Sequence, residues 1–315
     1  MKKMNNKGVT ITLITILTII LFTLVGGMIF LLNSNFEFNN VRIFSGQSTK
    51  LVEEKEINNI KDLNITSNVA DIEINESDTN SIKVEFYSDY EEEHNIVENG
   101  KDIEITFKSK KKYGIMFLHK TPVVKIYVPS SYSNDVKINT ETSDIKINNL
   151  PNSNLDANLK TGDVRIKQIK NANIVLTTGD IDIEKVTELN STSTTGDIEI
   201  GTINKMITNT TTGDIKVSNV DSIEAKTTTG DIKIDNVNNS LILSTTTGDV
   251  KVENAAIKVN SNINTGTGDV KIESINGCYV EGSTKVGDTK INNSDRKSDI
   301  ELKITTRVGD IKVND

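Results

Sequence analysis

The aspartates are the residues whose type and spacing most suggest chemistry in this 315-residue chain. Ten of them recur at intervals of 17 to 22 residues, and a carboxylate repeated in this way could build a row of calcium sites. They are Asp144, Asp163, Asp180, Asp197, Asp214, Asp231, Asp249, Asp269, Asp288 and Asp310. However, calcium needs roughly six to eight oxygen ligands, and calcium-binding β-rolls place several glycines and an aspartate within about nine residues. One carboxylate per repeat matches poorly, so we expect neither a bound metal nor a cofactor.

Few other side chains could support catalysis. The two histidines, His94 and His119, lie outside the repeats, and neither has a metal-ligand or nucleophile partner nearby in the sequence. The single cysteine, Cys278, lies among apolar residues, as a small core residue would. The repeats show no break in which a cluster of catalytic side chains could form. We therefore predict that the protein is not an enzyme.

The charge of the chain argues against one class of partner. The formal net charge is −8, and an acidic surface repels the phosphates of nucleic acids. No segment combines a basic face with interleaved aromatic residues. We therefore exclude nucleic-acid binding as the function.

A glycine precedes nine of the ten aspartates, and Ser143 takes its place before Asp144. A fixed period of this length indicates one structural unit stacked on copies of itself. Glycine allows a backbone conformation or a close approach that a side chain would hinder, so we predict that these glycines form the structural corners of the repeats. They are Gly162, Gly179, Gly196, Gly213, Gly230, Gly248, Gly268, Gly287 and Gly309.

The residues around each glycine predict the fold class. The positions two and four residues after it are almost always isoleucine or valine, as at Ile232 and Ile234, and they alternate with charged residues. Two such period-2 runs per repeat predict two short strands joined by turns. We therefore predict an all-β fold in which residues 141–315 form a parallel β-solenoid of about ten coils, each 17–20 residues long. Coils spaced about 4.8 Å apart would give a rod about 45–50 Å long.

The outward positions predict two charged columns. One column is the ten aspartates, and the other is the residue two positions after each aspartate, which is basic in eight of the ten repeats. The two columns would largely neutralise each other, so we interpret the aspartates as a structural charge ladder. The threonine triplets, such as Thr227–Thr229, could in principle bind ice, but β-propensity and hydroxyl ladders explain them better.

Residues 57–140 continue this pattern in part. Residues 57–74 read as an N-terminal coil with Ala70 in place of the glycine, and residues 75–135 depart from the pattern. Longer strands are expected there at Ile82–Tyr87, Ile103–Lys108 and Val123–Val128, in hairpins beside the solenoid. Loops are expected at Glu91–Glu93 and Lys108–Lys112. Residues 33–56 read as a tether.

The N-terminus predicts a membrane anchor. Val9 to Leu32 are 24 residues without a formal charge, enough for a transmembrane α-helix across a hydrocarbon core of about 30 Å. The lysines of residues 1–8 place that end in the cytoplasm and residues 33–315 outside, as an uncleaved signal anchor in the cell membrane. An alternative is a type IV prepilin, because Gly8 and the residues after it resemble that cleavage site. The glutamate that prepilins need is replaced by Leu13.

The repeats, with Val128-Pro129 just before them and a single membrane anchor, resemble the bacterial putative-adhesin family of β-strand-repeat domains. The resemblance covers residues 57–315 and implies no catalytic residues. It implies a surface-displayed adhesion or binding scaffold whose partner is an envelope glycan or a protein. An accessory role in envelope-stress sensing and a pilin-like filament component are the alternatives. We also expect that the edge after Val313 could self-associate.

Overall fold

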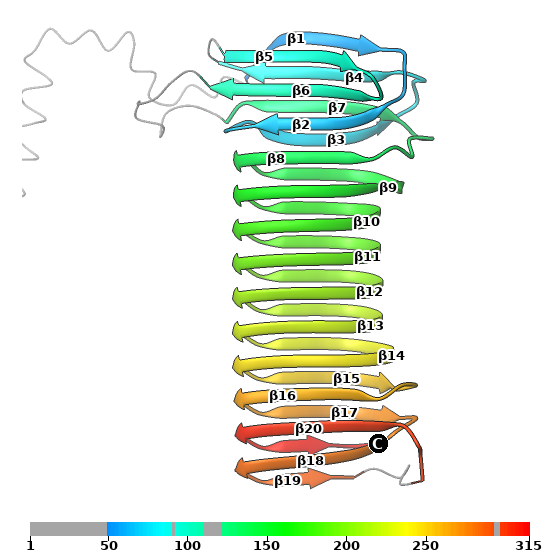
Figure 1. The fold of residues 1–315 in the computed structure, drawn as a ribbon, viewed down its shortest axis with the longest axis vertical. Coiled ribbons are helices and arrows are strands. Elements are labelled where there is room, and N and C mark those ends of the chain that lie inside the picture. Colours follow the sequence, from blue (N-terminus) through cyan, green and yellow to red (C-terminus); the bar gives the residue numbers. More distant parts are fainter. Residues whose placement is uncertain (1–48, 90–91, 110–120, 293–296) are drawn as a thin grey trace, which may run out of the picture. The chain divides into compact units, whose positions relative to one another are not determined.

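The computed structural model describes residues 49–89, 92–109, 121–292 and 297–315, all of which belong to one compact unit. Residues 1–8, the predicted anchor Val9–Leu32 and most of the predicted tether lie outside the described residues, as does His119. The described residues contain strands and no helix (Figure 1). Within these ranges, therefore, no helix is long and apolar enough to cross a membrane.

The central strands form the predicted parallel solenoid, of about nine turns rather than about ten. Each strand pairs in parallel with the one in the next coil, so that Val164 lies beside Ile181 and Ile181 beside Ile198. These strands are β8 (Val136–Thr142), β9 (Ile145–Thr161), β10 (Val164–Thr178), β11 (Ile181–Thr195), β12 (Ile198–Thr212), β13 (Ile215–Thr229) and β14 (Ile232–Thr247).

The prediction of two short strands per repeat holds for the repeats that begin at Val250, Val270 and Thr289, but it was wrong for the central repeats. Each repeat from β10 to β13 is one continuous strand of 15 residues that runs along both sides of the coil. The alternation of buried and exposed residues changes phase on either side of one buried residue, Ile169 in β10. The backbone therefore bends there while it keeps its pairing with the neighbouring coils.

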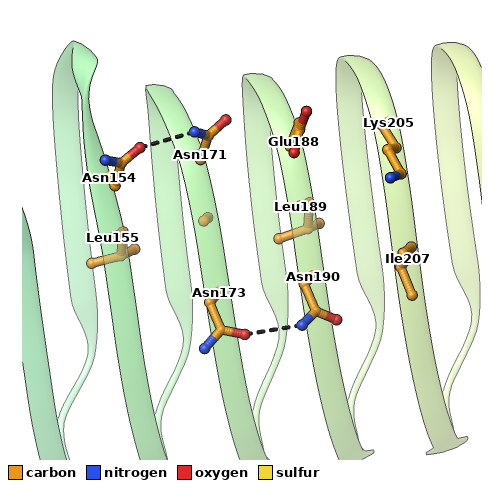
Figure 2. Close-up of a pocket in the computed structure, with 10 residues that line it drawn as sticks. Asn154, Leu155, Asn171, Asn173, Glu188, Leu189, Asn190, Lys205 and Ile207 are labelled. Carbon is orange, nitrogen blue, oxygen red and sulfur yellow. Dashed lines mark hydrogen bonds between the residues drawn. The ribbon is translucent and has the colours of Figure 1, made fainter.

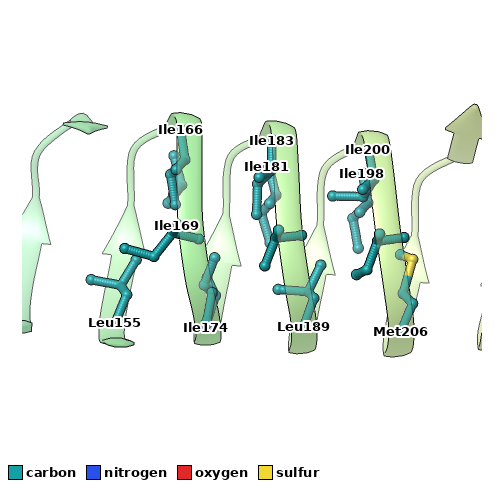
Figure 3. Packing of buried hydrophobic residues seen from close by; sticks show 14 of the residues in the cluster. Leu155, Ile166, Ile169, Ile174, Ile181, Ile183, Leu189, Ile198, Ile200 and Met206 are labelled. Carbon is teal, nitrogen blue, oxygen red and sulfur yellow. The ribbon is translucent and has the colours of Figure 1, made fainter. Parts of the chain in front are cut away.

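The core is a thin layer between the two sides of each coil. Ile181, Ile183, Ile198 and Ile200 point inward from one side, and Leu189 and Met206 from the other (Figure 3). All are at most 2% exposed. Burying an aliphatic side chain of this size contributes about 1.5–3 kcal/mol. Because a coil contacts only the coils on either side, its stability depends mainly on packing against these two neighbours.

The N-terminal strands cap the solenoid, whose stack of coils we also call the column. They are β1 (Lys50–Ile57), β2 (Asp62–Ser67), β3 (Asp71–Ser77), β4 (Ile82–Ser88), β5 (Glu92–Asn99), β6 (Asp102–Ser109) and β7 (Val123–Pro129). The predicted N-terminal coil is present as β2 and β3, with Ala70 fully buried between them. This coil lies between β6–β7 and β8–β9, and β1, β4 and β5 add antiparallel pairings beyond it.

Two boundaries in this region differ from the expectations. Residues 50–56 are not a tether, because β1 pairs with β4 along its length. Glu92, Glu93 and Lys108 are not loop residues, because they belong to the β5–β6 hairpin. Both segments carry many charges, which made them look solvated in the sequence, but one side of each strand faces the cap core through Ile57 and Ile96.

The order of the coils is reversed at the C-terminal end. The strands there are β15 (Val250–Ala256), β16 (Ser261–Thr267), β17 (Val270–Asn276), β18 (Tyr279–Val286), β19 (Thr289–Ile291), β20 (Glu301–Val308) and β21 (Ile311–Val313). The last coil in the sequence, β20–β21, lies between β16–β17 and β18–β19 (Figure 1). The prediction that Val313 borders the exposed edge was therefore wrong, and the terminal coil is β18–β19.

Side-chain size explains this order. The inward positions of the β20–β21 coil hold Leu302 and Ile304, which are fully buried and suit an internal coil. The β18 strand has Gly282 where β20 has Ile304. A Cβ on Gly282 would lie 2.6 Å from Cδ1 of Ile291, so the Ile291 side chain fills the missing volume and closes the column.

Candidate functional site

The predicted corner glycines have the geometry that requires glycine. Their φ angles lie between 135° at Gly162 and 149° at Gly230, a region that L side chains rarely adopt. The coils also approach each other closely at this point. A Cβ on Gly213 would lie only 2.0 Å from the carbonyl oxygen of Gly196. Each glycine therefore serves both the turn and the stacking.

The aspartates after these glycines make a bond that the sequence did not predict. The Asp214 backbone N–H donates to carboxylate Oδ1 of Asp197 in the preceding coil, at 2.8 Å. The flanking N–H groups donate to backbone carbonyls, from Gly213 to Thr229 and from Ile215 to Asp231. At the corner the aspartate N–H thus bonds to a carboxylate instead of a carbonyl, which satisfies a donor that the turn would otherwise leave unpaired.

This bond runs without interruption through the column, and we call the series the aspartate ladder. Ten bonds join, in spatial order, Asp71, Asp144, Asp163, Asp180, Asp197, Asp214, Asp231, Asp249, Asp269, Asp310 and Asp288. One oxygen of each carboxylate that accepts such a bond is thereby engaged in the backbone. The aspartate ladder therefore joins each coil to the next at this corner.

The basic column neutralises the aspartate ladder directly at one place. Arg165 contacts Asp163 at 2.6 Å and Asp144 at 3.7 Å. The ion pairs of the lysines on this face join them to other acidic residues, as between Lys216 and Glu199 or between Lys251 and Glu253. These pairs are well exposed, so each contributes little stability. No group of three or more His, Cys, Asp or Glu side chains in the described ranges could hold a metal ion.

The feature best suited to a ligand is a groove on the opposite corner of the column, which we call the amide groove. It has a volume of about 380 Å³ and crosses four coils from β9 to β12 (Figure 2). Asparagine amides line it: Asn171 donates to Asn154 at 2.9 Å, and Asn190 donates to Asn173 at 3.2 Å. The groove therefore presents ordered amide groups to solvent.

The groove lies over a small core side chain. Ala172 pairs in register with Leu155 on one side and Leu189 on the other, and all three are buried. Its side chain faces inward, as that of Leu189 does, while the neighbouring Asn171 and Asn173 face the groove. Glu188 and Lys205 line the same end of the groove and are in register, so their charges largely offset each other. Ile207 adds an apolar wall.

A second hollow of about 270 Å³ shares Asn154 and Leu155 with the amide groove and extends toward the cap. It is acidic, with Asp62, Asp102 and Asp135 among its lining residues. Burial acts to raise the pKa of Asp62, but hydrogen bonds from the Asp135 backbone N–H and from Asn134, together with Lys101, outweigh it and hold the pKa below its usual range. These partners already engage the Asp62 carboxylate.

The amide groove presents hydrogen-bonding groups suited to binding. Its lining residues include no serine, cysteine or histidine that could act as nucleophile or base. Amides both donate and accept hydrogen bonds, as hydroxyl groups do. The sequence analysis did not identify these residues. A signal for them was present in the sequence. Asparagine recurs one repeat apart at two positions, first at 154 and 171 and then at 173 and 190, on either side of Ala172.

A cluster of titratable groups in the cap has a structural role, because its members bond to one another within and between the cap strands. Glu85 is 6% exposed and accepts hydrogen bonds from Lys83 at 2.6 Å and Tyr87 at 2.8 Å. The bond to Glu85 raises the pKa of Tyr87 to about 12. His94 lies 2.8 Å from Glu53 and against the Phe86 ring, between β5 and β1. These contacts hold the cap strands together.

The comparison with known families agrees with this architecture. Residues 60–314 match the family model described as Toastrack DUF4097. The chain belongs to the Toastrack DUF4097 family. The resemblance to a β-strand-repeat family is thereby confirmed, and the match covers the cap strands from β2 onward as well as the solenoid.

Several solved structures are similar to this member of the family at low identity. A putative adhesin from Parabacteroides merdae is 15% identical, with a TM-score of 0.39 over 84% of this chain and 97% of that one. A putative lipid binding protein from Parabacteroides distasonis is 17% identical, with a TM-score of 0.34 over 83% and 96%. A putative cell adhesion protein from Clostridium sporogenes is 14% identical, with a TM-score of 0.28 over 84% and 99%. No curated protein matches the chain.

Proposed function

We propose that the protein is a non-enzymatic, surface-displayed scaffold that binds an uncharged envelope polysaccharide in the amide groove. The observation that carries this proposal is the set of aligned amides of Asn154, Asn171, Asn173 and Asn190 around the hollow above Ala172. Sugar hydroxyls donate and accept hydrogen bonds and so match amides. An extended polymer also suits a groove that crosses successive coils.

The charges near the groove favour an uncharged ligand. Glu188 and Lys205 face the same end and offset each other. The neighbouring hollow is acidic, and the chain as a whole carries a formal charge of −8. An acidic polysaccharide would be repelled by this surface.

The proposal includes attachment to the cell membrane through Val9–Leu32, with residues 1–8 in the cytoplasm. Two features of the sequence support it: the uncharged length of that segment and the lysines that precede it. Because β1 begins at Lys50 and belongs to the cap, the chain enters the column at the capped end.

The proposal is tested by binding of the full chain, in detergent, to an array of uncharged and acidic bacterial polysaccharides. The informative variant is Asn173→Ala combined with Asn190→Ala. The matched control is Asn219→Ala combined with Asn236→Ala, a stacked and hydrogen-bonded pair outside the groove. We expect binding to an uncharged polysaccharide that only the first variant weakens. Equal loss in both variants, or no binding by the wild type, would refute the proposal.

A further inference from the structure

The asparagines of the amide groove form two hydrogen-bonded rows, which we call the amide rows. Each row steps from one coil to the next, and each ends on an aspartate on the side of the cap. In every step an asparagine Nδ2 donates to a side-chain oxygen of the preceding coil, at distances of 2.9 to 3.2 Å. The rows are Asn171 to Asn154 to Asp135, and Asn190 to Asn173 to Asp156.

The aspartates fix the orientation of both amide rows. A carboxylate only accepts hydrogen bonds, so the asparagine next to it must turn its NH2 group toward the carboxylate, and its carbonyl oxygen then faces the following coil. The second asparagine meets that oxygen and is oriented in the same way. The carbonyl oxygens of Asn171 and Asn190 therefore point away from the cap, toward the next coil (Figure 2).

Neither of these two oxygens meets a side-chain donor at its own register position in the next coil. The residue in register with Asn171 is Glu188, whose carboxylate only accepts, and the residue in register with Asn190 is Ile207, whose side chain is apolar. All four residues line the amide groove. The amide rows thus end in two carbonyl acceptors, with an apolar side chain beside one of them. A fitting ligand presents hydrogen-bond donors and, next to one donor, an apolar group.

We propose that the unit bound at the end of the amide rows is an N-acetylated amino sugar of the polysaccharide. This inference rests on the proposed function and names the class of sugar. In a trans acetamido group the N–H and the methyl group point to the same side. When that N–H donates to Asn190 Oδ1, the methyl group lies toward the adjacent coil, about 4.8 Å away, where Ile207 is half-buried. A sugar hydroxyl can donate to Asn171 in the same pose.

The residues around the two acceptors favour an acetamido group over the other groups that a sugar carries at this place. A free ammonium group would also donate to carbonyl oxygens, and Glu188 would attract it. However, Lys205 is in register with Glu188 and would repel an ammonium group, and Ile207 would strip water from it without replacing the lost hydrogen bonds. A hydroxyl group would donate to Asn190 but leave Ile207 uncovered. The acetamido group satisfies both residues.

The class of sugar is tested with the full chain in detergent and three oligosaccharides of equal length and linkage, built from N-acetylglucosamine, glucose or glucosamine. We expect the N-acetylglucosamine oligomer to bind about tenfold more tightly than the other two. Ile207→Ser should remove that preference. The matched control is Ile242→Ser, an exposed residue in the same register two coils further on and outside the groove, and it should keep the preference. Circular dichroism establishes that both variants are folded.

The outcomes separate this inference from the proposed function. If the glucose oligomer binds as tightly as the N-acetylglucosamine oligomer, and Asn173→Ala with Asn190→Ala weakens both, the class of sugar is wrong while the groove remains the site. Tightest binding of the glucosamine oligomer would overturn the inference in favour of an ammonium group. A preference for N-acetylglucosamine that Ile207→Ser retains would also overturn it. If none of the three binds, the inference fails, and the polysaccharide array decides whether the proposed function fails with it.

Discussion

The backbone N–H of Asp231 donates a hydrogen bond of 2.8 Å to carboxylate Oδ1 of Asp214, one coil earlier. The carboxylate replaces a carbonyl where the preceding glycine turns the chain, which explains why glycine and aspartate recur together. It also explains why a carboxylate offered in every coil need not be a metal ligand. The groove that we propose as the binding site lies on the opposite corner.

Asp214→Ala should lower the free energy of unfolding by about 1 kcal/mol, because the Asp231 N–H loses its acceptor. Asp214→Asn keeps an accepting oxygen and removes one charge from the aspartate ladder, so its unfolding free energy should stay close to that of the wild type. Urea denaturation measures both. Glu224→Ala, an exposed change on the same coil, is the control. Equal losses in the alanine and asparagine variants would contradict the role of the carboxylate oxygen.

Gly213→Ala should be destabilising by more than about 2 kcal/mol. It combines a φ of 147° with a Cβ that would lie 2.0 Å from a backbone oxygen. Gly100→Ala separates these causes, because Gly100 has a φ of 58° and no atom within 4 Å of the added Cβ. That variant should cost only about 1 kcal/mol. Thermal unfolding of the two variants compares them, and similar losses would show that coil approach is unimportant.

Glu85 should make the cap sensitive to acid. Burial acts to raise its pKa, but hydrogen bonds from Lys83 and Tyr87 outweigh it and hold the pKa below the ordinary value of 4.5. A depressed carboxyl pKa stabilises the folded state above the ordinary value, and this contribution is lost as pH falls through the folded-state pKa. Unfolding free energy measured from pH 6 downward should therefore decline less steeply below about pH 4.5 in Glu85→Gln than in the wild type. Identical slopes would argue against the Glu85 network.

The reversed order of the last coils can be tested by paired cysteines. Ser283 lies beside Thr305, and Thr305 lies beside Asn264. Ser283→Cys with Thr305→Cys should therefore give an intramolecular disulfide on mild oxidation. Ser283→Cys with Asn264→Cys should not, because β20 separates the two positions. Mass spectrometry of proteolytic fragments distinguishes these products. A disulfide in the second pair would show that the coils follow sequence order, because β18 would then lie between β16 and β20.

Much of the fold could be predicted because every repeat has the same alternation of apolar and polar residues. Alternating Ile and Val predicted the inward face, and the substitution of Ala70 for glycine still allowed the first coil to be recognised. The order of the last coils could not be predicted from adjacency in the sequence, since it depends on the core volume at Gly282 and Ile304. Charged strands such as β1 were mistaken for solvated segments because only one of their faces packs.

The site was harder to predict than the fold for a related reason. Repeat analysis draws attention to what recurs, and the glycines and aspartates recur because they build the corners. The amide groove lies instead over a departure from the repeat, where Ala172 stands between coils that carry leucine. Its asparagines resemble ordinary polar surface residues until their positions in neighbouring coils are known.

The most direct test of the proposed function is the affinity of Asn173→Trp for the uncharged polysaccharides that bind the wild-type chain. Asn173 is exposed and lines the amide groove, so the variant should fold while its larger side chain occupies the groove. We predict that binding falls at least about tenfold, with unchanged circular dichroism and thermal unfolding. Unchanged affinity in the folded variant would contradict the assignment of the amide groove as the binding site.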